Sequence, residues 1–134
     1  MKNQKNEVSD KELQTVIADF LEMGHVENII SMFRHEPDYF RWTGIFLSDE
    51  RINVRLGLAI LFEEFRAIAP DMMTLAIPSL ADLLHSPEPL YRGEAISLLG
   101  FIGNEESLAL IKEHAEDPSP QVREMVAMVL EEQA

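Results

Sequence analysis

The chain contains no cysteine, one tryptophan, and only 11 lysine and arginine residues against 24 aspartate and glutamate residues. The absence of cysteine excludes disulfide bonds, thiolate metal ligands and a cysteine nucleophile. The formal net charge of −13 argues against a nucleic-acid partner, because affinity for phosphates comes mainly from clustered lysine and arginine. No apolar run reaches the roughly 18 residues of a membrane-spanning helix, and no apolar signal segment follows the N-terminal lysines. We therefore expect a cytoplasmic protein with neither a membrane nor a nucleic-acid partner.

The 134 residues are 46% hydrophobic and 26% charged, which is typical of one globular domain. No segment of strand length alternates apolar and polar residues, whereas apolar residues recur at helical spacing throughout the chain. These patterns predict an all-α protein of about eight helices. We expect residues 1–8 to form a flexible N-terminus and residues 9–134 to form a single domain.

Several signals mark where the helices begin and end. Ser9 with Glu12 predicts a capping box, Gly24 stands where a helix end requires positive φ, and Gly103 is expected to end another helix. The segment from Ser48 or Asp49 to about Ala69 predicts a long helix that is apolar on most sides and therefore central and buried. Residues 71–85 predict another helix, with Pro78 inside it or dividing it in two.

Two further segments place a capping residue before a proline. Ser86-Pro87 and Asp117-Pro118 predict helices whose first residue is that proline. The segments Ser86–Arg92 and Asp117–Arg123 share the order small cap, proline, polar, proline, any, apolar, arginine, and Asp49–Arg55 is a weaker copy. Their arginines are 37 and 31 residues apart, a period typical of helical-hairpin repeats.

With these motifs the sequence resembles the HEAT-repeat family, in particular the short bacterial repeats called phycobilisome-lyase-like. The resemblance rests on Tyr91-Arg92, Val122-Arg123, Leu99-Gly100 with Ile102-Gly103, and residues 77–84. It implies an α-solenoid of about four stacked helical hairpins, clearer over residues 48–134 and degenerate over residues 9–47. One arginine per repeat, here Arg55, Arg92 and Arg123, is expected to join neighbouring repeats in a structural ladder rather than to contact a ligand.

Some HEAT-repeat proteins are enzymes, and the deoxyhypusine hydroxylases hold two irons with His-Glu pairs directly after the repeat arginine. The corresponding pairs in this sequence are Leu56-Gly57, Gly93-Glu94 and Glu124-Met125, which contain no histidine. No two of the four histidines lie three or four residues apart, and no phosphate-binding or nucleophile motif is present. We therefore expect no catalytic, cofactor or metal site, and a protein that is not an enzyme.

Two groups of residues are candidates for an interaction surface. Tyr39, Phe40 and Trp42 lie in an aromatic segment that predicts either a binding site or, as the favoured alternative, a core joining the N-terminal part to the repeats. Met125 and Met128 lie on the last helix, off its apolar face, where we expect a following repeat to stack. This end of the solenoid is therefore expected to support a homodimer or partner docking.

The sequence thus favours a non-catalytic scaffold that binds a protein or peptide on its concave helical face. Acidic residues of the repeat region suggest a partner with a basic surface: Asp82, Glu105, Glu106, Glu113, Glu116 and Asp117. The alternative is an accessory subunit of a lyase-like or chaperone-like system that acts on a cofactor-bearing protein.

Overall fold

A computed structural model describes residues 8–133, and within that range the chain forms helices and no strand. The α-helices are α1 (Asp10–Glu22), α2 (Val26–His35), α3 (Thr43–Leu47), α4 (Ile52–Ile68), α5 (Ile77–Leu83), α6 (Pro89–Ile102), α7 (Glu105–Lys112) and α8 (Pro120–Gln133). Two 3₁₀ helices, η2 (Pro37–Trp42) and η3 (Pro70–Ala76), lead directly into α3 and α5. The predicted all-α, HEAT-like architecture is confirmed. The predicted flexible N-terminus lies, except for Val8, outside the described residues.

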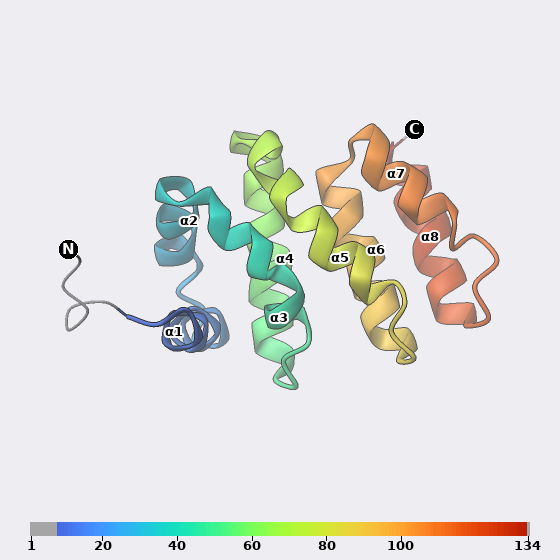
Figure 1. Cartoon of the computed structure of the whole chain (residues 1–134). Helices are drawn as coiled ribbons and strands as arrows, with labels where there is room; N and C mark the ends of the chain where they lie inside the picture. Colours follow the sequence, from blue (N-terminus) through green and yellow to red (C-terminus); the bar gives the residue numbers. More distant parts are fainter. Residues whose placement is uncertain (1–7, 134) are drawn as a thin grey trace.

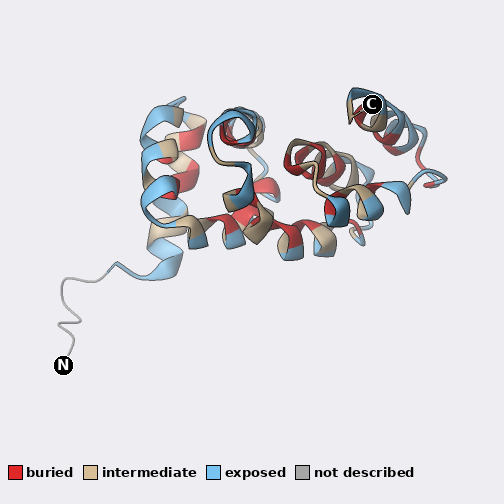
Figure 2. Cartoon of the chain, turned by 90° about the horizontal axis from the view of Figure 1, so that it is seen from above, coloured by how far each residue is buried: buried red, intermediate tan, exposed pale blue. Residues whose placement is uncertain are grey.

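The helices stand in two layers along the length of the chain (Figure 1). Helices α4, α6 and α8 form one layer, which we call the inner layer. The outer layer contains η2 with α3, η3 with α5, and α7, and the hairpin of α1 and α2 closes the N-terminal end. Seen from above, the row bends toward the inner layer (Figure 2). No helix within residues 8–133 is long and apolar enough to cross a membrane.

An aromatic cluster joins the N-terminal segment to the first clear repeat. The ring of Phe40, in η2, makes edge-to-face contacts with Phe33 of α2 and with Phe62 and Phe65 of α4, at centroid distances of 4.8, 5.6 and 4.9 Å. All four side chains are fully buried. Such pairs contribute about 0.5–1.5 kcal/mol each beyond the area they bury. The cluster therefore makes residues 26–42 part of the same core as α4.

The same turn precedes each of the three long inner helices. A side-chain oxygen of Asp49, Ser86 or Asp117 accepts a hydrogen bond from the backbone N–H two residues later, at 2.9, 3.1 and 2.9 Å. The helix then begins three residues after that acceptor, at Ile52, Pro89 and Pro120. The prediction that Pro87 and Pro118 open their helices is wrong, because the preceding residue caps a turn and not the helix. The second proline of each motif is the first helical residue.

Other predicted boundaries have mixed outcomes. The capping box at Ser9, positive φ at Gly24 and the helix end at Gly103 are confirmed, and Asn104 is the N-cap of α7. Of the two alternatives for residues 71–85, the division in two is confirmed: the 3₁₀ helix η3 ends at Ala76, and Pro78 lies in the first turn of α5. Nor is α4 buried on most sides: Leu56, Ile60 and Ile68, which the prediction placed in the core, are exposed.

Close contact between α6 and α8 depends on a residue without a side chain. A Cβ atom on Gly100 would lie 2.5 Å from Cγ1 of Val129, well inside contact distance. The Gly100 carbonyl also accepts a hydrogen bond from the Gln133 side chain at 3.0 Å. Gly100, predicted only as part of a repeat motif, therefore sets how closely the last two inner helices approach.

Candidate functional site

The three repeat arginines make one identical contact. In each case Nη1 donates to the carbonyl oxygen six residues earlier: Arg55 to Asp49 at 2.8 Å, Arg92 to Ser86 at 2.9 Å and Arg123 to Asp117 at 2.7 Å. The accepting residue is the one whose side chain closes the turn before the helix. Each arginine thus binds the turn that opens its own helix.

Arg55 and Arg92 also reach forward to an acidic residue of the next repeat. Nε and Nη2 of Arg92 donate to the two carboxylate oxygens of Asp117 at 3.0 and 2.8 Å. Nε of Arg55 lies 2.8 Å from Oε1 of Glu94, but neither atom has a directed hydrogen bond, so this contact is an ion pair. Among the described residues Arg123 has no carboxylate partner. The structure places two of the three predicted ladder arginines between repeats and the third at the end of the row.

The electrostatics of these pairs follow from burial and hydrogen bonding. Bonds from Arg92, from the Ser119 N–H and from His114 hold the pKa of the Asp117 carboxyl well below its usual range. The same bond to Asp117 raises the pKa of Arg92. Burial raises the pKa of Glu94, although the positive charge of Arg55 opposes that shift. Glu94 is therefore held less firmly in its charged form than Asp117.

A fourth arginine, which the sequence analysis did not single out, extends the ladder to the N-terminal hairpin. Nη1 of Arg51 donates to Asp19 at 2.9 Å and to Glu22 at 2.8 Å, both on α1, and Nη2 donates to Asp49 at 2.9 Å. The hydrogen bond to Asp49 raises the pKa of Arg51 and lowers that of Asp49. The sequence offered one local sign of this role, namely Asp49 two residues before Arg51. The contacts with α1 join residues about 30 positions apart and depend on packing, so the sequence did not reveal them.

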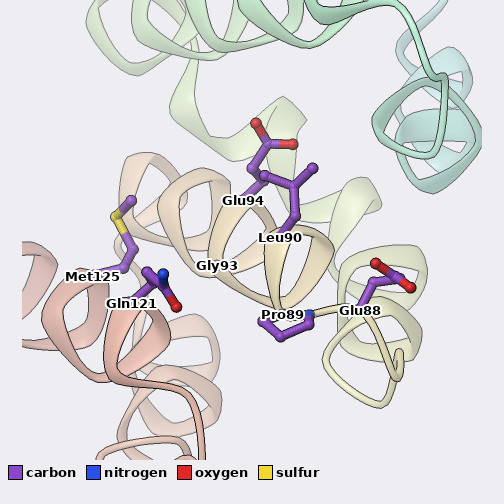
Figure 3. Close-up of a pocket in the computed structure, with 7 residues that line it drawn as sticks. All are labelled: Glu88, Pro89, Leu90, Gly93, Glu94, Gln121 and Met125. Carbon is purple, nitrogen blue, oxygen red and sulfur yellow. The ribbon is translucent and has the colours of Figure 1, made fainter.

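A groove of about 540 Å³ lies between the first turns of α6 and α8. Figure 3 shows its lining residues: Glu88, Pro89, Leu90, Gly93, Glu94, Gln121 and Met125. A smaller hollow of about 200 Å³ continues along the same two helices and shares Met125 with the groove. Its other lining residues are Arg66, Ser97, Gly100, Phe101, Met128, Val129 and Glu132. The inner layer therefore carries two adjoining hollows that share Met125, and their lining combines apolar side chains with four charged ones.

An exposed apolar row on α4 extends this surface. Ile52, Leu56 and Ile60 follow one another at four-residue spacing and are 61, 54 and 47% exposed. The other sides of α4 pack against α1 and α2, against α3 and η3, and against α6. Its free side is therefore the one that faces away from the outer layer. We call this row and the two hollows between α6 and α8 the inner face.

The predicted interaction residues fall into different environments. Met125 and Met128 line the smaller hollow beside α6, so the expectation that they face a following repeat is wrong. The reason is that Val122, Val126 and Val129 fill the core and turn the methionines toward the open inner side. Phe40 is fully buried, which removes it as a contact residue, whereas Tyr39 and Trp42 are half-buried.

The acidic residues expected to attract a basic partner do not lie on the inner face. Five of them, Asp82, Glu105, Glu106, Glu113 and Glu116, are exposed on α5, on α7 and just after α7, all in the outer layer. Asp117 is buried against Arg92 and cannot attract a partner. These five acids thus lie on the layer opposite the apolar row of α4.

The positions that correspond to the iron-binding pairs of deoxyhypusine hydroxylases do not supply a metal donor set. They hold leucine, glycine, methionine and two glutamates, of which Glu94 is paired with Arg55. Within residues 8–133 no three histidine, aspartate or glutamate side chains lie close enough to hold one ion. The residues at these positions therefore do not fit a diiron centre.

Comparison with known proteins agrees with the repeat geometry. Residues 77–133 match the family model for HEAT repeats. Over 90 residues, 66% of this chain, the sequence is 37% identical to deoxyhypusine hydroxylase from Mus musculus, of which the chain spans 28%. No solved structure matches. That relative is an enzyme, which contradicts the expectation of a protein that is not one. The match, the period of the arginines and the two-layered row of hairpins show that the chain contains HEAT repeats.

Proposed function

We propose that the inner face is a docking surface for a protein or peptide segment that presents apolar side chains. The main support for this proposal is the row of Ile52, Leu56 and Ile60 on α4. These side chains are exposed on the same face as the groove beside Leu90 and Met125. Single exposed apolar residues are common on protein surfaces, whereas contiguous apolar patches mark interaction sites. A HEAT scaffold with such a face has the form of a binding platform.

The chemistry of the face fits an apolar segment better than a strongly charged one. Met125 and Met128 add flexible, polarisable side chains that adapt to different ligands. The charged residues of the lining are Glu88 and Glu94 in the groove and Arg66 and Glu132 in the smaller hollow.

A peptide-display library selected on the purified chain tests this proposal. Selected peptides are expected to share apolar residues at helical or alternating spacing. The variant Leu56→Asp/Ile60→Asp should weaken their binding by about 100-fold or more, since burying each aliphatic side chain contributes about 1.5–3 kcal/mol. Ile45→Asp is the matched control, because Ile45 is 53% exposed but lies on α3 in the outer layer.

The outcome depends on the contrast between these variants. All the substituted side chains are exposed, so circular dichroism should show unchanged helicity in each. Peptides that bind the inner-face variant and the Ile45 variant with equal affinity would overturn the proposal. Selected peptides without apolar residues would overturn it as well.

An enzymatic role is a second candidate function: the 37% identity to deoxyhypusine hydroxylase supports it, whereas the residues at the positions of the iron-binding pairs count against it. The test is mass spectrometry of a deoxyhypusine-containing protein incubated with the purified chain and ferrous iron. A mass increase of one oxygen atom would support the role, and an unchanged mass would contradict it. An accessory role toward a cofactor-bearing protein stays a prediction, which the absorbance spectrum of a copurified complex would test.

A further inference from the structure

We propose that a second site, between the start of α1 and η2, binds the positively charged side chain of a lysine or arginine presented by a protein ligand. The site is a pocket of about 340 Å³ lined by Asp10, Leu13, Glu36, Asp38, Tyr39, Arg41 and Trp42. Its volume falls within the range of about 300–1,000 Å³ that is typical of ligand pockets. None of these residues belongs to the inner face, so this proposal can be tested independently of the proposed function.

Two aromatic residues of the lining, Tyr39 and Trp42, form a pair that the core holds in place. The rings of Tyr39 and Trp42 are stacked, with centroids 5.3 Å apart and an angle of 21° between their planes. Tyr39 also packs edge-to-face, at 5.7 Å, on Phe33, which is fully buried. The pair is therefore fixed before any ligand arrives, and binding costs little ordering of the rings.

The wall of the pocket is acidic. Asp10, Glu36 and Asp38 contribute three carboxylates, and Arg41 contributes the one positive charge of this lining. An aromatic face beside carboxylates attracts organic cations, because the ring quadrupole and the negative charges act in the same direction. Tryptophan is the strongest of the aromatic side chains in this role. The pocket thus carries a net charge of the sign that a basic side chain requires.

Arg41 already pairs with one acid of this lining. Its Nε donates to Oδ1 of Asp38 at 3.2 Å, yet the two side chains are 58 and 66% exposed. An ion pair exposed to this degree contributes little to stability. A ligand cation can therefore share Asp38 or replace Arg41 there at small cost.

Trp42 provides a direct measurement, because it is the single tryptophan of the chain. The purified protein is titrated with short peptides that contain arginine, lysine or, as the neutral analogue of arginine, citrulline, at constant ionic strength. The arginine or the lysine peptide should change Trp42 fluorescence with saturation, and the difference between them distinguishes guanidinium from ammonium recognition. The citrulline peptide should leave the fluorescence unchanged.

Substitutions assign the effect to this pocket. Asp10→Asn/Glu36→Gln should weaken binding of the better peptide by about fivefold, since each exposed charge contributes up to about a factor of five. Glu27→Gln is the matched control, because Glu27 is an exposed acid on α2 outside this pocket. A non-saturating response, an equal response to citrulline, or equal weakening by the control would overturn the proposal. Apolar peptides selected on the inner face report on the proposed function alone.

Discussion

The ion pair between Arg92 and Asp117 should be the part of the ladder on which stability depends most, and Asp117→Ala removes it. The two side chains are 13 and 3% exposed, and Asp117 accepts two hydrogen bonds from the guanidinium. It also accepts the Ser119 N–H at 2.9 Å and contacts Nδ1 of His114 at 3.1 Å. One carboxylate therefore closes the turn before α8 and binds that turn to α6.

The expected loss can be worked from this geometry. Removing one partner of a buried ion pair leaves the other charge unpaired, which costs about 3–5 kcal/mol. Arg92 keeps its bond to the Ser86 carbonyl and retains some contact with solvent, so we expect the lower end, about 3 kcal/mol. A domain of this size has a free energy of unfolding of about 5–15 kcal/mol, so the variant should still fold.

Urea unfolding followed by circular dichroism measures the difference. The matched control is Asp38→Ala, which removes an exposed ion pair with Arg41 and should cost less than about 1 kcal/mol. Equal losses for the two variants would refute the argument that burial gives the ladder its strength. The variant Asp117→Asn, which keeps an oxygen for the Ser119 N–H, should lose less than Asp117→Ala.

The same pair sets a dependence on pH, and its sign follows from the lowered pKa of Asp117. The unfolded carboxyl takes up a proton near its ordinary pKa of about 3.9, where the folded one is still ionised. The stabilisation is therefore complete above about pH 5 and decreases as the pH falls below about 4. Because Asp117→Asn removes the titrating group, its urea midpoint should change less between pH 5 and 3 than that of the parent protein.

Three further substitutions test local features of the fold. Gly100→Ala should lower the free energy of unfolding by about 1–3 kcal/mol, because the added methyl meets Val129 at 2.5 Å, whereas Gly93→Ala, with no atom within 4 Å, should raise it by about 0.5–1 kcal/mol. Thermal unfolding measures both, and equal shifts of the same sign would contradict the account. Ser9→Ala removes the acceptor of the Glu12 N–H and should cost about 0.5–2 kcal/mol. Amide hydrogen exchange measures this loss as reduced protection of the first turn of α1, and unchanged protection would refute the expectation.

Much of the helical architecture was predictable because its causes are local. A capping box at Ser9, the cap at Asn104 and the glycines at helix ends are formed by residues within a few positions of one another. The spacing of Arg55, Arg92 and Arg123 indicated the repeats. The predicted helix start at Pro87 was wrong because Pro87 and Pro89 both suit the first position of a helix. The hydrogen bond from the Glu88 N–H to Ser86 shows that the turn ends at Glu88 and that the helix begins at Pro89.

The candidate surfaces were much less predictable, because exposure depends on which elements surround a helix. Leu56 and Ile60 look like core residues in sequence, and they are exposed since no element covers the inner side of α4. Met125 and Met128 face a groove rather than a free end for the same reason. Glu94 could be assigned to Arg55 only after α4 and α6 were placed side by side.

The sequence by itself determined the scarcity of basic residues, the lack of cysteine, the helices and their repeat, because each is a property of composition or of residues close together in the chain. The tertiary structure decided where the acidity and the apolar surface lie. The outer layer carries the exposed acids of α5 and α7, while the inner layer carries the uncovered apolar row and the groove. The physical reason is that stacking fixes which face of each helix is covered, and no local pattern contains that information.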